Sequence, residues 1–139
     1  MIDLNRSVNL AINIAKGMEF LHTMDPLLFN YDLNSKHVMI DEDLTAKINM
    51  SDCKFSFCER KKVFSPAWMA PEVLKEKPED INKKSADMWS FAVILWELDT
   101  KEIPFKSYSP MQCGLKVIIT IKIINFYIVF LIFLICSNR

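Results

Sequence analysis

Reactive side chains are sparse in this sequence, and their spacing argues against two kinds of site. The four cysteines show no paired metal-ligand spacing and no companion histidine cluster, so we expect reduced thiols and no zinc site. Only two glycines occur, Gly17 and Gly114, whereas loops that grip phosphate groups need glycine. The remaining candidates for chemistry are two carboxylates in polar loops, Asp32 and Asp52, and their roles depend on the fold around them.

The amino-acid composition is typical of a globular protein. Hydrophobic residues make up 51% of the chain and charged residues 24%, and the formal net charge is zero. Because no basic or acidic excess is present, no nucleic-acid or polyanion partner is predicted. The first sixteen residues carry Asp3 and Arg6 where a secretory signal requires an unbroken apolar core, so we expect the chain to begin in the cytosol.

The first half of the sequence predicts a helix followed by a hairpin. From Asp3 to His22, apolar residues recur at helical spacing and indicate one buried face. Its members are Val8, Ala11, Ile12, Ala15 and Met18, with Leu10, Ile14 and Leu21 at the margin. Pro26 ends this run. Val38–Ile40 and Ala46–Ile48 are short strand-like runs on either side of an acidic turn, so they predict a small hairpin.

A second helix is predicted in the later half. Ser85 or Asp87 could cap it, and Trp89, Val93 and Trp96 then fall at i, i+4 and i+7 on one face. Its apolar residues extend round most of the circumference, which predicts a helix buried on nearly all sides. His22, at the end of the first helix, is expected to be a capping or surface residue.

Two runs identify the fold. Pro66–Glu72 reads PAWMAPE and Ser85–Phe105 reads SADMWSFAVILWELDTKEIPF, and together they resemble the C-terminal lobe of protein kinases. Within the kinases, three longer phrases resemble the integrin-linked kinase family of pseudokinases: GMEFLHT (Gly17–Thr23), LNSKHVMIDEDLTAKINMSDCKFSF (Leu33–Phe57) and KPEDINKKSADMWSFAVILWEL (Lys77–Leu98). The fold class predicted is therefore mainly α with a small β-hairpin, a truncated C-terminal lobe of the protein-kinase-like fold.

The resemblance covers residues 1–117 and leaves residues 118–139 as an apolar tail. A chain of 139 residues supports one modest domain, whereas a whole kinase domain needs roughly twice that length, so we expect a fragment or truncated isoform. The resemblance implies that the glycine-rich loop and the nucleotide-facing lysine belong to an N-lobe not found here. ATP and magnesium are cofactors of the parent family, and we do not expect this chain to bind them tightly.

The catalytic loop of active kinases resembles HRDLKxxN, and here the corresponding residues are Asn30–His37. The resemblance places Asp32 at the general base that accepts the substrate hydroxyl proton. Asn34 stands at the lysine that steadies the transferring phosphoryl group, and a neutral amide lacks that charge. His37 replaces an asparagine that holds a second magnesium. Tyr31 replaces the arginine that binds a phosphorylated activation loop.

The DFG triplet that binds metal in kinases corresponds to Asp52, Cys53 and Lys54. The resemblance makes Asp52 a candidate magnesium ligand. Two interpretations of Lys54 stay open: its ammonium could lie near the phosphates of a nucleotide, with Asn34 beside them, or it could be a solvated loop lysine.

The function implied is that of a pseudokinase scaffold that links integrin adhesions to actin. The implied partners are a parvin-type actin-linker protein and the integrin β cytoplasmic tail, at focal adhesions on the cytoplasmic face of the plasma membrane. The implied contact residues for parvin are Leu115 and Lys116, supported by Glu72; the alternative is that Leu115 packs inward. By analogy, Glu72 would pair with an arginine late in the C-lobe. The rival hypotheses are an active serine/threonine kinase that uses Asp32 and Asp52, and a gene-model fragment without function.

The tail allows three explanations. Val117–Cys136 is long enough to span a bilayer once, with Lys122 and Asn125 as its only interruptions. Its dominant residue types are encoded by A/T-rich codons, which favours translated noncoding sequence. A genuine membrane anchor and a buried extension of a helix are the other two, and a membrane partner is expected only if the tail is genuine.

Overall fold

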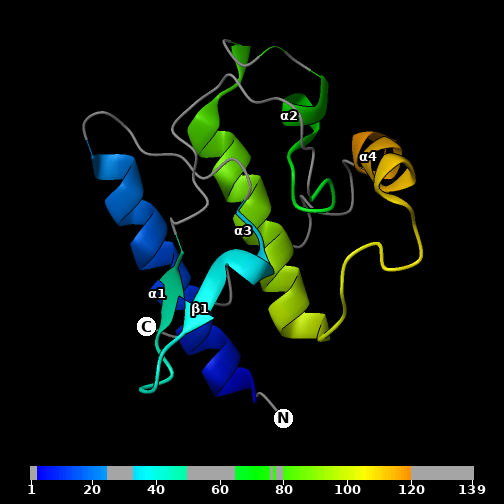
Figure 1. Cartoon of the computed structure of the whole chain (residues 1–139). Coiled ribbons are helices and arrows are strands. Elements are labelled where there is room, and N and C mark those ends of the chain that lie inside the picture. Colours follow the sequence, from blue (N-terminus) through cyan, green and yellow to red (C-terminus); the bar gives the residue numbers. More distant parts are fainter. Residues whose placement is uncertain (1–2, 25–32, 50–64, 76, 78–79, 120–139) are drawn as a thin grey trace.

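The computed structural model describes residues 3–24, 33–49, 65–75, 77 and 80–119. Helices dominate these residues, and the strands form one two-stranded antiparallel sheet (Figure 1). The elements are α1 (Leu4–Thr23), the short 3-10 helix η1 (Ser35–His37), β1 (Val38–Ile40), β2 (Ala46–Ile48), α2 (Pro71–Lys75), α3 (Lys83–Thr100) and α4 (Pro110–Ile119). The predicted class, mainly α with a small β-hairpin, is confirmed.

Helix α1 begins directly after its N-terminal capping residue, Asp3. The Asp3 carboxylate accepts a hydrogen bond of 2.7 Å from the backbone N–H of Arg6, which satisfies one of the free donors of the first turn. The buried face is centred on Leu10 and Ile14, which the spacing analysis placed at the margin of the stripe. The helix was therefore predicted correctly, but its buried face is rotated from the predicted one.

The hairpin has the bounds that the sequence predicted and packs on α1. Val38 pairs with Ile48 and Ile40 with Ala46. A side chain added at Gly17 of α1 would place its Cβ 3.2 Å from the tip of Ile48, so glycine permits this close approach.

The hairpin turn is fixed by polar contacts. The Asp41 carboxylate accepts a hydrogen bond from the backbone N–H of Thr45 at 2.8 Å and pairs with the Lys47 ammonium at 2.9 Å. The hydrogen bond from Lys47 lowers the pKa of Asp41. Because both groups are solvated, we assign this pair a role in turn geometry rather than in stability.

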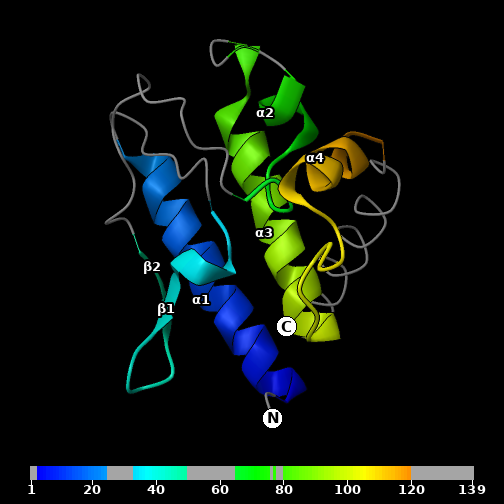
Figure 2. The ribbon, with the colours of Figure 1, turned by 45° about the vertical axis from the view of Figure 1, so that its right-hand side comes forward.

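Helix α3 lies between α1 on one side and α4 on the other, as Figures 1 and 2 both show. The prediction that Ser85 or Asp87 caps this helix is wrong, because the cap is Asn82, whose side chain accepts from the backbone N–H of Ser85 at 3.1 Å. From Ala86 to Leu95 the helix is buried on most of its circumference, as predicted. The buried members are Ala86, Asp87, Ser90, Phe91, Ala92, Val93, Ile94 and Leu95.

One core joins the described elements. Side chains from α1, the hairpin, Trp68 and α3 meet in it, and α4 contributes Cys113 and Val117. Burial raises the pKa of the Cys113 thiol, so this cysteine is neutral in the core. Because α4 packs into the same core as α3, tertiary packing fixes its orientation and stabilises this short helix.

Replacing Ile94 by alanine tests the central position of α3. Ile94 is 2% exposed, so Ile94→Ala should lower the free energy of unfolding by about 2–5 kcal/mol in urea titrations. Leu4→Ala is the matched control, since Leu4 is 73% exposed and its loss should change the free energy by less than about 0.5 kcal/mol. Equal effects of the two variants would contradict this account of the core.

Candidate functional site

Asn34 lies inside the protein rather than at its surface. Its side chain is 1% exposed, its carbonyl oxygen accepts from the backbone N–H of Lys36 at 3.0 Å, and its amide nitrogen donates to the Ser65 hydroxyl at 3.4 Å. The first bond caps η1 and the second ties this loop to the beginning of the 65–75 segment. The amide is therefore engaged by groups of the protein itself.

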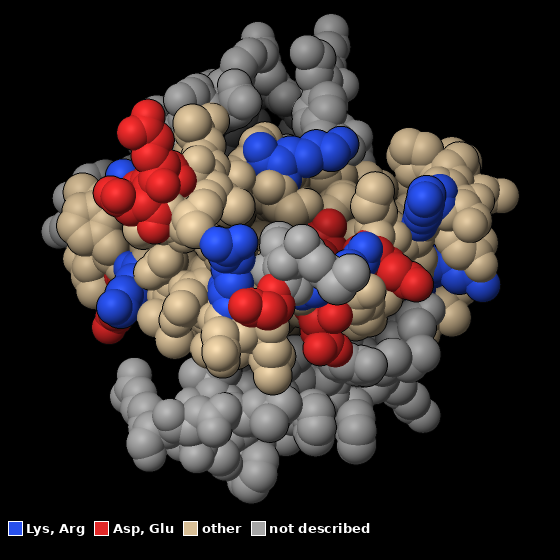
Figure 3. All heavy atoms as spheres, turned by 90° about the horizontal axis from the view of Figure 1, so that it is seen from below, with Lys and Arg blue, Asp and Glu red and all other residues tan. Residues whose placement is uncertain are grey.

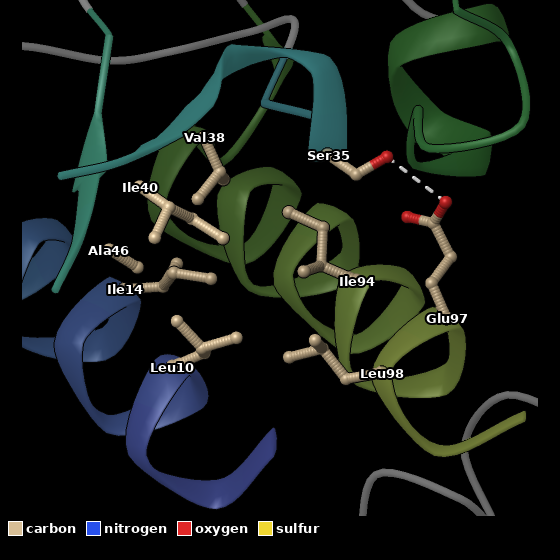
Figure 4. Close-up of a pocket in the computed structure, with 9 residues that line it drawn as sticks. All are labelled: Leu10, Ile14, Ser35, Val38, Ile40, Ala46, Ile94, Glu97 and Leu98. Atoms are coloured by element: carbon tan, nitrogen blue, oxygen red, sulfur yellow. Dashed lines mark hydrogen bonds between the residues drawn. The ribbon is translucent and has the colours of Figure 1, made fainter. Parts of the chain in front are cut away.

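Glu97 of α3 binds two segments that are distant in sequence. Its carboxylate accepts one hydrogen bond from the Trp68 indole N–H at 2.7 Å. It accepts another from the Ser35 hydroxyl at 3.0 Å, which Figure 4 draws as a dashed line. Burial raises the pKa of Glu97, while these two hydrogen bonds oppose that shift. Ser90, also on α3, binds the Trp68 segment as well, because its hydroxyl donates to the Trp68 backbone carbonyl at 2.8 Å.

His22 and Asp87 join the end of α1 to the first turns of α3. The His22 Nε2 atom lies 2.8 Å from an Asp87 carboxylate oxygen, and both side chains are largely buried. The expectation of a surface or capping role for His22 is therefore wrong. Sequence reasoning missed this pair because its members are 65 residues apart and no local pattern links them.

A small apolar pocket lies between α1, the hairpin and α3. It has a volume of about 160 Å³ and is lined by aliphatic side chains that point toward one another (Figure 4). The lining residues are Leu10, Ile14, Ser35, Val38, Ile40, Ala46, Ile94, Glu97 and Leu98. The two polar members, Ser35 and Glu97, bond each other, so this pocket suits an apolar group better than a phosphate.

Three predicted site residues, Asp32, Asp52 and Lys54, lie outside the described residues. Their roles as candidate base, magnesium ligand and nucleotide contact stay predictions. Within residues 3–24, 33–49, 65–75, 77 and 80–119, no group of histidine, cysteine and acidic side chains could hold a metal ion. Acidic and basic side chains are interspersed among uncharged ones on the face in Figure 3, so charge on that face does not single out an anionic ligand.

The other predicted residues lie on and beside α4. We define the α4 surface as Met111, Leu115, Lys116 and Ile119, all of which are exposed. Leu115 is 57% exposed, so the alternative that it packs inward is wrong. The opposite face holds Cys113 and Val117 in the core.

Glu72 lies in the first turn of α2, which packs against α4. Its side chain is half-buried, and it forms no ion pair in the part of the chain that the structure describes. The arginine that the resemblance implies as its partner is not among those residues. Glu72 therefore neighbours the helix that carries the α4 surface, and its supporting role stays a prediction.

Comparison with known proteins decides the family. A family model described as protein tyrosine and serine/threonine kinase matches residues 1–120. The chain belongs to this kinase family. It is 55% identical over 117 residues to the integrin-linked protein kinase homolog pat-4 of Caenorhabditis elegans and to the scaffold protein ILK of Homo sapiens, with 84% of the chain covered in each case. It is also 38% identical over 116 residues to the serine/threonine-protein kinase CTR1 of Arabidopsis thaliana.

These identities confirm the resemblance to integrin-linked kinases, and the kinase match confirms the C-lobe-like fold. The chain spans about a quarter of the length of these relatives, 25% of pat-4 and 26% of ILK, and 14% of CTR1. No helix among the described residues is long and apolar enough to cross a bilayer. Most of the predicted membrane span, residues 117–136, lies outside them.

Replacing Glu97 by glutamine tests the cost of burying its charge. An acid whose pKa is raised on folding binds more protons in the folded state, so its contribution to stability increases as pH falls through the folded pKa and is complete below the ordinary value of 4.5. The free energy of unfolding of the unmodified chain, relative to Glu97→Gln, should therefore increase as pH falls from neutral to the ordinary pKa of 4.5 in urea titrations. A difference that is constant with pH, or that decreases, would contradict the burial of this charge.

Proposed function

We propose that this chain acts as a pseudokinase scaffold, a binding platform that connects integrin adhesions to actin through a parvin-type partner. The observation that carries this proposal is the α4 surface, an exposed apolar stripe on a helix whose other face is buried. The names of the most similar relatives support it, since ILK is called a scaffold protein.

The geometry of α4 suits recognition of another protein. Met111, Leu115 and Ile119 follow one another at intervals of four residues, so they form a single stripe along the helix. Met111 and Ile119 are 81% and 77% exposed. A row of exposed apolar side chains beside a charged residue has the composition of an interaction site, with an apolar centre and a polar rim.

The partners proposed follow from the resemblance. A parvin-type actin-linker would contact Leu115 and Lys116, with Glu72 supporting the surface through α2. The integrin β cytoplasmic tail is the second proposed partner, and focal adhesions at the cytoplasmic face of the plasma membrane are the proposed location. The buried Cys113 and Val117 support this proposal because they fix the side of α4 that is presented to a partner.

The alternative is a serine/threonine kinase in which Asp32 acts as base and Asp52 holds magnesium for ATP. The name of the Arabidopsis relative favours this alternative. The Asn34 side chain favours the scaffold. The resemblance assigns its position to the lysine that stabilises the transferring phosphoryl group, but Asn34 is neutral and is hydrogen-bonded to Lys36 and Ser65. In a longer protein that includes an N-lobe, an active kinase would lose phosphotransfer on Asp32→Asn and a scaffold would show none to lose.

Alanine substitution tests the α4 surface. Leu115→Ala and Lys116→Ala together should weaken capture of a purified parvin-type protein at least about tenfold, measured by calorimetry with the 139-residue chain. Phe20→Ala is the matched control, because Phe20 is 63% exposed but lies on α1, across α3 from α4 (Figure 2). Unchanged capture by the double variant would remove these residues from the interface, and no capture by the unmodified chain would refute the proposed function.

A further inference from the structure

The Lys116 side chain is held by a residue outside its own helix. Its ammonium nitrogen lies 5.5 Å from the centre of the Tyr108 ring, within the range of a cation–π interaction. Tyr108 precedes the start of α4 at Pro110, so the loop between α3 and α4 sets this contact. In the described part of the chain Lys116 forms no salt bridge, and its charge is therefore not neutralised by a carboxylate.

The loop fixes the Tyr108 ring from the core outward. Phe105 packs against the core with a φ of 54°, an uncommon backbone conformation for a residue other than glycine. Its carbonyl accepts a hydrogen bond of 2.9 Å from the backbone N–H of Tyr108. The two rings meet edge to face, with centroids 6.3 Å apart and planes at 66°. The ring of Tyr108 is thus positioned by contacts that begin in the core.

The start of α4 is held in the same loop. The Gln112 side-chain oxygen accepts from both the backbone N–H and the hydroxyl of Ser109, each at 3.1 Å. Gln112 lies one helical turn before Lys116 and on the same side of α4. Its amide oxygen faces the loop, and the Lys116 ammonium lies within range of the Tyr108 ring.

We propose that Tyr108 is a positioning residue of the α4 surface, which holds the Lys116 ammonium beside exposed Leu115 so that the surface accepts a partner carrying a carboxylate next to an apolar face. This inference rests on the proposed function. A flexible lysine loses rotamer entropy when a partner fixes it, and a lysine already held over a ring loses less. Charge complementarity indicates the carboxylate, because the unneutralised Lys116 lies at the edge of an apolar stripe.

Calorimetric binding of the 139-residue chain to a purified parvin-type protein tests the inference. Tyr108→Leu should weaken binding about two- to fivefold, whereas Tyr108→Phe, which keeps the ring, should bind as the unmodified chain does. In a Lys116→Ala background, Tyr108→Leu should have no further effect, because the ring then has no ammonium to hold. Neutralising the partner's acidic residues should produce the same loss as Lys116→Ala.

The outcomes separate the two proposals. If the unmodified chain binds but Tyr108→Leu weakens binding equally with and without Lys116, the positioning role is overturned and the proposed function stands. If the unmodified chain does not bind, the proposed function fails, and the contact between Tyr108 and Lys116 is then tested in the free chain alone. The proton spectrum of the free chain then shows which step was wrong: a ring-current shift of the Lys116 side chain, kept in Tyr108→Phe and lost in Tyr108→Leu, would confine the error to the partner.

Discussion

The carboxylate of Glu97 is the constraint on which the described structure depends. It is placed in the less solvated side of α3, where a charge is disfavoured, and it is satisfied by hydrogen bonds from Trp68 and Ser35. These donors, one in η1 and one in the 65–75 segment, lie more than thirty residues apart in sequence, so one side chain brings three segments together. A half-buried acid of this kind contributes little net stability. Losing one of its donors would leave a polar group unpaired at a cost, so the arrangement favours this one packing of the three segments.

The sequence predicted those parts of the fold that depend on local patterns. The hairpin bounds follow from strand-like runs and the extent of α1 from apolar residues at helical spacing, and both were correct within a residue or two; the capping role of Asp3 was not predicted. The predicted cap of α3 was wrong because several polar side chains near its start are able to cap. Which of them does so depends on the residue at which the helix begins, and the sequence pattern did not fix that residue. The rotation of the α1 face toward Leu10 and Ile14 reflects the position of the hairpin and α3, which spacing within one helix does not contain.

Only part of the candidate site could be predicted from the sequence. Leu115 and Lys116 were predicted through the resemblance, but helical spacing left open which face of α4 turns outward. That question is decided by the packing of Cys113 and Val117, a tertiary property. Tyr108 was missed altogether, because its contact with Lys116 joins a loop to a helix across eight positions and produces no periodic signal.

The contacts of α3 also explain how this kinase-like architecture holds the α4 surface at its exterior. Trp68, held by Glu97 and Ser90, belongs to the same short run as Pro66. A Cβ added at Gly114 of α4 would lie 3.9 Å from Pro66, so the run that α3 holds is the one on which α4 rests. The position of the α4 surface thus follows from contacts between α3, the 65–75 segment and α4. None of these contacts requires a nucleotide or a metal, and the same scaffold geometry can be retained where the phosphoryl-steadying lysine is replaced by a buried asparagine.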